Sequence, residues 1–191
     1  SIIEKNISHE TLIEDVSLLP HIGEDNYDTV HYQNWCYVST GKGDTIEKKL
    51  GDGQTTCHFL KKEFMKERNL IDNLGKDEEP LGIVPAVLKH LLDARNATKK
   101  RMKKEPNEFK KKVLDGLQLA YKVTANSVYG QLGAKTSTIY KMKLAACTTS
   151  VGRSRIDDAS FGVKDWANKK GYPEPDVIYG DTDSVFVKFS R

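Results

Sequence analysis

The chain has 191 residues, is 38% hydrophobic and 30% charged, and carries a net charge of +3, which is the composition of a globular protein of one domain or two small lobes. No apolar run approaches the roughly 20 residues that a membrane-spanning helix needs, and the first residues have no secretory-signal pattern, so nothing marks this sequence as a membrane protein. Cys36, Cys57 and Cys147 form no C-x-x-C pair, which indicates reduced thiols and an intracellular protein.

The positive charge is concentrated in one stretch. Between Arg95 and Lys122 there are ten Lys or Arg residues against three acidic residues, a local excess of seven. Such a cluster suits a phosphate chain or a triphosphate, although Lys runs are more commonly solvated helix faces.

The region from Pro20 to Pro80 is rich in turn-forming residues and carries no recognisable chemistry. Apolar and aromatic runs at Trp35 to Ser39 and Thr56 to Leu60 predict a short hairpin. A helix is predicted within Lys61 to Leu74, ending before the polar segment that precedes Pro80.

A helix is predicted to begin near Val84 and Pro85, because proline is tolerated in a first turn. Its apolar residues fall at helical spacing, at Val84, Val87, Leu88, Leu91 and Leu92. At about 100° per residue, Arg95 and Lys99 continue that inward stripe, so each needs an anionic partner. A protein carboxylate and a bound phosphate both satisfy that need.

A second helix is predicted from Asn107 or Glu108 to Val128, ending at Gly130, and the short connection makes the two helices antiparallel. Its expected apolar stripe comprises Val113, Leu117, Ala120, Tyr121 and Val128. The opposite, open face carries Lys122, Asn126 and Tyr129 at positions i, i+4 and i+7. An ammonium, an amide and a flat ring together suit a nucleotide.

The C-terminal part predicts a helix followed by a β-hairpin. The helix is expected from Lys143 to Lys170, with Cys147 as a core residue, and it should pack against the hairpin. The hairpin is expected from Val177 to Val187 around a turn that holds Asp181 and Asp183. Two carboxylates held this closely repel each other until a hard cation such as Mg²⁺ neutralises them.

Two motifs of this sequence, in the order in which they follow each other along the chain, resemble motifs of the family B DNA polymerases. The Y-G-D-T-D-S string resembles the third polymerase motif of that family, and residues 122–130 fit its K-x-x-x-N-S-x-Y-G motif at every specified position. The opening Ser1-Ile2 resembles the end of D-x-x-S-L-Y-P-S-I, which places that motif's catalytic Asp and its Tyr upstream of residue 1. The resemblance covers residues 1–13 and 81–189, and it is closest to polymerases of large DNA viruses of algae or protists.

The resemblance implies roles for the residues that match. Arg95 and Lys99 match an R-x-x-x-K on the fingers helix that grips the incoming triphosphate, and Lys122 would contact its phosphates. Asn126 would support nucleotide binding, and Tyr129 would close over the nascent base pair. Asp183 would be the metal ligand of this chain and Asp181 a secondary ligand, for two Mg²⁺ ions whose remaining ligands lie upstream.

The expected fold is α+β, with an antiparallel palm sheet backed by helices and an antiparallel two-helix fingers hairpin. We expect residues 1–80 to be partial palm with an irregular insert, 81–130 the fingers, and 131–191 a palm helix with the catalytic Asp hairpin.

The expected function is that of a fragment of a DNA-directed DNA polymerase that works by two-metal nucleotidyl transfer. Its partners would be primer-template DNA and deoxynucleoside triphosphates, with a processivity factor as a further candidate and no membrane. It would act in the nucleus or cytoplasm of an infected cell if it is viral. Two alternatives stay open, a non-catalytic nucleic-acid-binding lobe and a reverse transcriptase. The helix motif and the Asp-Thr-Asp spacing argue against the reverse transcriptase.

Overall fold

The computed structural model describes residues 2–39, 46–70, 79–181 and 184–189, and for residues 34–39, 46–52 and 181 it describes the backbone only. The chain divides into two compact units, residues 1–147 and 148–191. Each is described here by itself. The content of helices and antiparallel strands agrees with the predicted α+β class.

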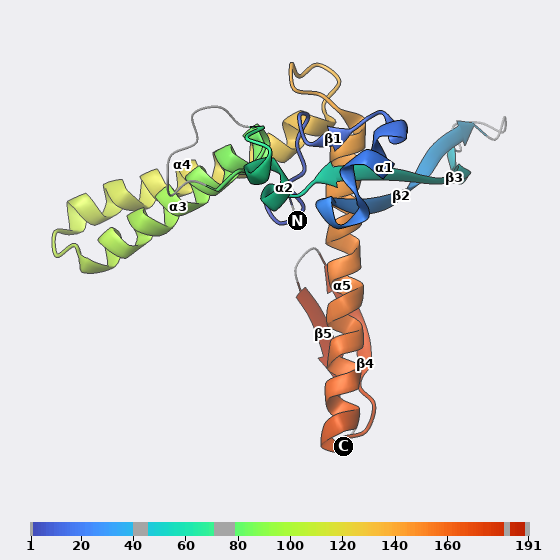
Figure 1. Cartoon of the computed structure of the whole chain (residues 1–191). Helices are drawn as coiled ribbons and strands as arrows, with labels where there is room; N and C mark the ends of the chain where they lie inside the picture. The colour runs from blue at the N-terminus through green and yellow to red at the C-terminus, as the bar shows by residue number, and fades with distance from the viewer. Residues whose placement is uncertain (1, 40–45, 71–78, 182–183, 190–191) are drawn as a thin grey trace. The chain divides into compact units, whose positions relative to one another are not determined.

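The first unit contains a three-stranded antiparallel sheet in the order β1-β3-β2, formed by β1 (Leu12–Ile13), β2 (Tyr27–Ser39) and β3 (Ile46–Leu60). Two 3-10 turns, η1 (Val16–Leu18) and η2 (Glu24–Asn26), and the short helix α1 (Leu19–Ile22) connect β1 to β2. The six-residue helix α2 (Lys62–Glu67) follows β3 and is shorter than predicted. Figure 1 shows β2 and β3 as two long strands, which pair antiparallel.

The hairpin predicted in this region is present, but it is much longer than predicted. The strands are 13 and 15 residues long, and β3 continues through the glycines that were expected to interrupt it. The pairing register shifts between Gln33 and Trp35, and Gly53 adopts a φ of 85° at that point. A bulge absorbs extra residues while the ladder continues, and glycine permits the left-handed backbone that such a bulge requires.

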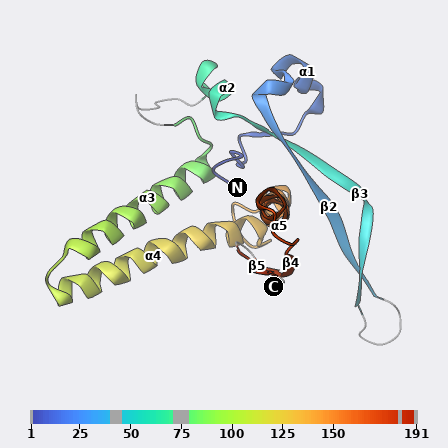
Figure 2. The ribbon, with the colours of Figure 1, turned by 90° about the horizontal axis from the view of Figure 1, so that it is seen from below.

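The helical hairpin was predicted correctly. Helices α3 (Ile83–Lys104) and α4 (Glu108–Gly133) lie side by side and antiparallel, as Figures 1 and 2 both show. The Asn107 side chain accepts hydrogen bonds from the Phe109 and Lys110 amides, at 3.0 and 3.1 Å, and so caps α4. The helix α5 (Met142–Lys170) also matches its prediction to within one residue.

The core of the first unit lies where the N-terminal loop, β3, the end of α4 and the start of α5 meet. Fully buried side chains in this core are those of Ile7, Phe59, Leu132, Leu144 and Cys147. Cys57 is buried as well, and both of these cysteines are free thiols, as the sequence indicated.

Helix α3 begins at Gly82, which has no side chain to cap the helix. Instead, three side chains of the N-terminal loop accept hydrogen bonds from its first amides. The Gly82 amide donates to Asn6 Oδ1 at 2.8 Å, the Val84 amide donates to Ser8 Oγ at 3.2 Å, and the Ile83 amide donates to the Glu10 carboxylate. A Cβ at residue 82 would lie 2.6 Å from the Ser8 Cβ, so only glycine allows this close approach.

Asn6 is the centre of this cap. It is 3% exposed, its Nδ2 donates to the Leu60 carbonyl at 3.0 Å, and its φ is 50°, a conformation that asparagine tolerates better than most residues. Its side chain therefore joins the end of β3 to the start of α3.

We predict that Asn6→Ala lowers the free energy of unfolding by about 2–4 kcal/mol, because it leaves a buried amide and a carbonyl unpaired and puts alanine in the left-handed region. Thermal or denaturant unfolding measures the change. Asn69→Ala is a matched control, since Asn69 has a φ of 47° and its side chain has no hydrogen bond to any residue that the structure describes. The control should cost only about 1–2 kcal/mol. Equal losses in the two variants would contradict a capping role for Asn6.

Candidate functional site

Arg95 lies on the face of α3 that packs against α4, as its helical phase predicted. The less exposed residues of α3 recur at helical spacing, in the series Val84, Leu88, Leu91, Arg95, Thr98 and Met102. Arg95 reaches across to α4, where its Nε donates to Gln118 Oε1 at 3.3 Å. Its partner is thus a neutral amide, and the carboxylate alternative does not hold for this residue.

Lys99 does not continue the inward stripe, so this prediction was wrong. Thr98 occupies that position at 5% exposure, and its hydroxyl donates to the Ala94 carbonyl at 2.8 Å. Lys99 is exposed on the neighbouring face. The inward spacing after Leu91 continues with steps of four and three residues, to 95 and 98, whereas the prediction took two steps of four.

On α4, the predicted polar face is present. Lys122, Asn126 and Tyr129 are all exposed and follow one another at i, i+4 and i+7 along one uninterrupted helix. Tyr129 is 42% exposed, so its ring is partly available to a ligand.

The predicted apolar stripe of α4 was correct only in part. Val113 and Leu117 are 57% and 40% exposed, and Ala120 is exposed as well. The less exposed positions of α4 lie one residue further along the helix, at Leu114, Gln118, Tyr121, Ala125, Val128 and Leu132. The stripe contains a polar residue, Gln118, which hydrophobic periodicity could not assign to a packed face.

Within the described part of the chain, the helical hairpin carries both paired and unpaired cations. None of the described residues forms an ion pair with Arg95, Lys99 or Lys122. Two other lysines of these helices are paired, Lys89 with Glu79 at 3.1 Å and Lys111 with Glu108 at 3.3 Å. Three uncompensated positive charges on one arm make a positive field that attracts a polyanion.

The hydrogen bond between Arg95 and Gln118 fixes the level at which these cations lie. Gln118 and Lys122 are one turn apart on α4, or about 6 Å along the axis. Because α3 runs in the opposite direction, Lys99 lies about one turn from Arg95 on the other side. The three cations therefore span roughly 12 Å along the hairpin, a distance that long, flexible side chains can shorten.

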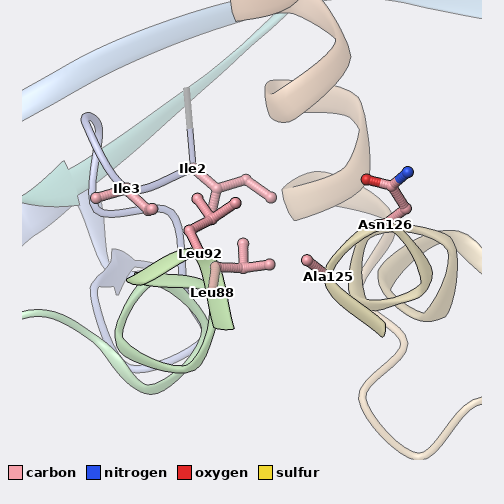
Figure 3. Close-up of a pocket in the computed structure, with 6 residues that line it drawn as sticks. All are labelled: Ile2, Ile3, Leu88, Leu92, Ala125 and Asn126. Carbon is pink, nitrogen blue, oxygen red and sulfur yellow. The ribbon is translucent and has the colours of Figure 1, made fainter. Parts of the chain in front are cut away.

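A cavity of about 250 Å³ lies at the base of the hairpin. Figure 3 shows Ile2, Ile3, Leu88 and Leu92 gathered on one side and Ala125 directed toward Leu88. Asn126, the next residue of α4, also lines the cavity, and its amide extends away from the four apolar side chains. The N-terminal segment and both helices thus meet at the turn of α4 that carries one of the predicted nucleotide-binding residues.

The second unit contains the predicted β-hairpin. Strands β4 (Asp176–Asp181) and β5 (Ser184–Lys188) pair antiparallel, with Asp181 opposite Ser184 and a register irregularity between Val177 and Tyr179. The hairpin lies along α5 as predicted. A Cβ on Gly180 would be 3.1 Å from Ile156 Cγ2 on that helix, so a larger residue at this position would meet the Ile156 side chain.

Aromatic and ionic contacts fasten the ends of this unit. The Trp166 ring stacks on Tyr172 at 5.6 Å and meets Phe189 edge-on at 6.4 Å, and Lys164 pairs with Glu174 at 3.0 Å. The hairpin that carries the acidic turn is therefore held against α5 at its base.

Asp183 lies outside the described residues, and of Asp181 only the backbone is described. Among the residues that are described, no group of three or more His, Cys, Asp or Glu could hold a metal ion. The donor set still suits a hard divalent ion, because the sequence places carboxylates at positions 181 and 183, beside the pair that Asp181 forms with Ser184. Two carboxylates are fewer ligands than Mg²⁺ requires, so the others would come from elsewhere.

The family model for "DNA polymerase family B" matches residues 1–191, the whole chain. The chain belongs to DNA polymerase family B. The match includes residues 14–80, which the sequence motifs alone related only loosely to that family.

Relatives of family B show the same correspondence. The chain is 36% identical to the DNA polymerase of Phaeocystis pouchetii virus, covering 100% of this chain and 19% of that protein. It is 33% identical to the DNA polymerase of Pyramimonas orientalis virus, with 99% and 17% coverage, and 42% identical to the DNA polymerase delta catalytic subunit of Dictyostelium discoideum, with 82% and 13% coverage. The chain thus spans less than a fifth of the length of these relatives.

A solved structure supports the fold. The family B DNA polymerase of the archaeon Pyrobaculum calidifontis matches 99% of this chain and 18% of that chain, with a TM-score of 0.53 and 28% identity. Within the residues that the structure describes, no helix is both long and apolar enough to cross a membrane.

Sequence reasoning missed two sets of residues at this site. Gln118, the partner of Arg95, is a single polar residue in the α4 stripe, and its only signal was its four-residue spacing from Lys122. The capping residues Asn6, Ser8 and Glu10 lie more than 70 positions from the amides that they bind. No local pattern could have paired them.

Proposed function

We propose that this chain is the palm-and-fingers segment of a DNA-directed DNA polymerase that extends a primer with deoxynucleoside triphosphates. The observation that carries the proposal is the set of uncompensated cations, Arg95, Lys99 and Lys122, on an antiparallel helical hairpin whose sequence matches family B. The proposed division is residues 1–80 as palm with an insert, 81–130 as fingers and 131–191 as palm helix and acidic hairpin.

In the proposed nucleotide complex, Arg95, Lys99 and Lys122 bind the triphosphate. Arg95 offers planar, paired N–H donors and the lysines offer compact charges, so together they neutralise phosphate oxygens. Asn126, beside the cavity at the base of the hairpin, supports the nucleotide, and the partly exposed Tyr129 ring packs on the nascent base pair. Binding of this kind orients the α-phosphate for attack by the primer 3′ oxygen.

Asp183 is the proposed metal ligand of this chain, and Asp181 is a secondary ligand or an electrostatic support. When bound, two Mg²⁺ ions would supply Lewis acidity toward the primer 3′ oxygen and the phosphates. The carboxylates hold the hairpin turn negative, so cations and not phosphates are drawn to this end of the unit.

The partners that follow from this proposal are primer-template DNA and deoxynucleoside triphosphates, with a processivity factor as a further candidate. The proposed location is the compartment of the cell in which the viral or cellular genome is copied, the nucleus or the cytoplasm.

We predict that Asp183→Asn in the full-length polymerase abolishes nucleotide incorporation and leaves the affinity for primer-template within about twofold, because the loss is confined to a metal-binding carboxylate. Primer extension and a DNA-binding titration measure the two effects. Near-normal incorporation by this variant would refute the metal-ligand assignment.

We also predict that Lys122→Ala raises the KM for nucleotide by about tenfold or more, because one charge-assisted contact to phosphate is lost. The Kd for primer-template should change less. Steady-state extension over a range of nucleotide concentrations tests this, and Lys112→Ala, at an exposed lysine nearer the tip of the same helix, is the control. An unchanged KM in Lys122→Ala would contradict the role.

A second candidate is a nucleic-acid-binding lobe without catalysis. It is favoured by the length of the chain, which spans less than a fifth of the polymerases that it matches. The isolated 191 residues, incubated with primed template, nucleotides and Mg²⁺, are expected to bind DNA at best and to extend no primer. Extension by the isolated chain would overturn the expectation that further ligands lie upstream.

A further inference from the structure

We propose that Gln118 is a positioning residue that holds the Arg95 guanidinium in place for the triphosphate and so sets the affinity for nucleotide. The inference rests on the proposed function. It starts from the hydrogen bond by which Arg95 Nε donates to Gln118 Oε1 at 3.3 Å across the helical hairpin.

The amide of Gln118 has one orientation that satisfies both of its ends. Its Oε1 faces the Arg95 Nε–H, while its Nε2 donates to Asp115 Oδ1 at 3.0 Å. With the amide reversed, a donor would face the arginine and an acceptor would face the carboxylate, and both hydrogen bonds would be lost. The relay from Asp115 through Gln118 therefore holds the acceptor against Arg95.

The contact leaves the part of the guanidinium that binds phosphate available. A guanidinium has five N–H donors, and the bond to Gln118 engages only the one on Nε. The four donors on the two terminal nitrogens remain for an anion, and a planar guanidinium whose Nε is fixed can turn less freely. Because the Arg95 side chain is already ordered before nucleotide binds, the entropic cost of ordering it does not reduce the affinity for nucleotide.

The neutrality of the partner matters as much as its geometry. A carboxylate at position 118 would form an ion pair with Arg95 and compete with the triphosphate for it. The negative charge of the relay resides instead on Asp115, one helical turn away from Gln118 and facing solvent. Arg95 thus keeps its full charge while its side chain is held.

Gln118 is also placed to act on the whole cation set. It lies on the half-buried face of α4 and one turn from Lys122, so the hydrogen bond brings the Arg95 side chain to the turn next to that lysine. Without it, the arginine could occupy other rotamers along α4.

The test uses the full-length polymerase with Gln118→Met, a substitution of similar length and helix propensity that removes the amide. We expect the KM for nucleotide to rise about tenfold, with kcat and the Kd for primer-template within about twofold, because the contact that weakens is one to a charged group. Gln131→Met is the matched control, since Gln131 is exposed on the same helix and its side chain has no hydrogen bond to the described residues. Its KM should stay within about twofold.

A double-mutant cycle separates positioning from a structural role. If Gln118 acts through Arg95, then Gln118→Met should add no more than about twofold to the KM of an Arg95→Ala enzyme. A rise of the same size with and without Arg95, or an unchanged KM in Gln118→Met, would overturn the inference. Gln118→Leu serves if the Met variant unfolds at a lower temperature than the parent protein.

The same experiment distinguishes this inference from the proposed function. A parent protein that extends no primer contradicts the function itself. An active parent whose KM is insensitive to Gln118 leaves the function intact and removes only the positioning role.

Discussion

The helical hairpin depends on a cap that its own sequence does not supply. Helix α3 begins with a glycine, and its first three amides donate to the Asn6, Ser8 and Glu10 side chains of a loop more than 70 residues away. Unpaired amides at a buried helix end would cost about 1–3 kcal/mol each. The start of the arm is therefore bonded to the N-terminal loop, and that loop is bonded through Asn6 to the end of β3. The carboxylate of Glu10 also suits the positive end of the helix dipole.

The cap explains how an arm can carry charges that it does not neutralise. Arg95, Lys99 and Lys122 gain nothing from a carboxylate partner among the described residues, and their mutual repulsion works against folding. The hairpin is stabilised instead at its base, by the cap and by the burial of Leu88 and Leu132. Stability and binding thus belong to different parts of the same two helices. Charges could be kept for a ligand because the base makes them unnecessary for the fold.

The sequence was most informative where local chemistry decides the structure. Apolar spacing and the Asn107 cap predicted where the three long helices begin, although α4 runs to Gly133, past its predicted end at Gly130. The β-hairpin followed from two β-branched runs around an Asp-rich segment. The prediction failed where distant contacts decide. The glycines of β3 resemble turn residues, yet they lie within a strand that stays paired with β2 on both sides of a bulge. On α4, exposed apolar residues such as Val113 shifted the predicted face by one position, and the polar Gln118 took the inward place.

The site was predictable as a set of residue types and not as a set of contacts. Motif spacing identified Lys122, Asn126 and Tyr129 as one face, which the uninterrupted helix bears out. It placed Lys99 on the inward face, where Thr98 lies instead. A period of 3.6 residues alternates steps of three and four residues, and the packing against the partner helix decides which step occurs at each turn. The role of Asp181 and Asp183 as metal ligands stays a prediction, since the side chains of both lie outside the described residues.

The N-terminal segment has two structural roles, because it supplies the cap of α3 and also lines the cavity beside Asn126. Ile2 and Ile3 line that cavity, and Asn6, which caps α3, follows shortly after them in the sequence. A displacement of the arm at its base would have to break buried hydrogen bonds or open an apolar contact, so small displacements are resisted. There is no room for a Cβ at Gly82, so the start of α3 lies in close contact with the N-terminal loop. The position of the proposed nucleotide-binding face is therefore set by the geometry of a few residues at the base of the hairpin, and the exposed tip can vary without moving it.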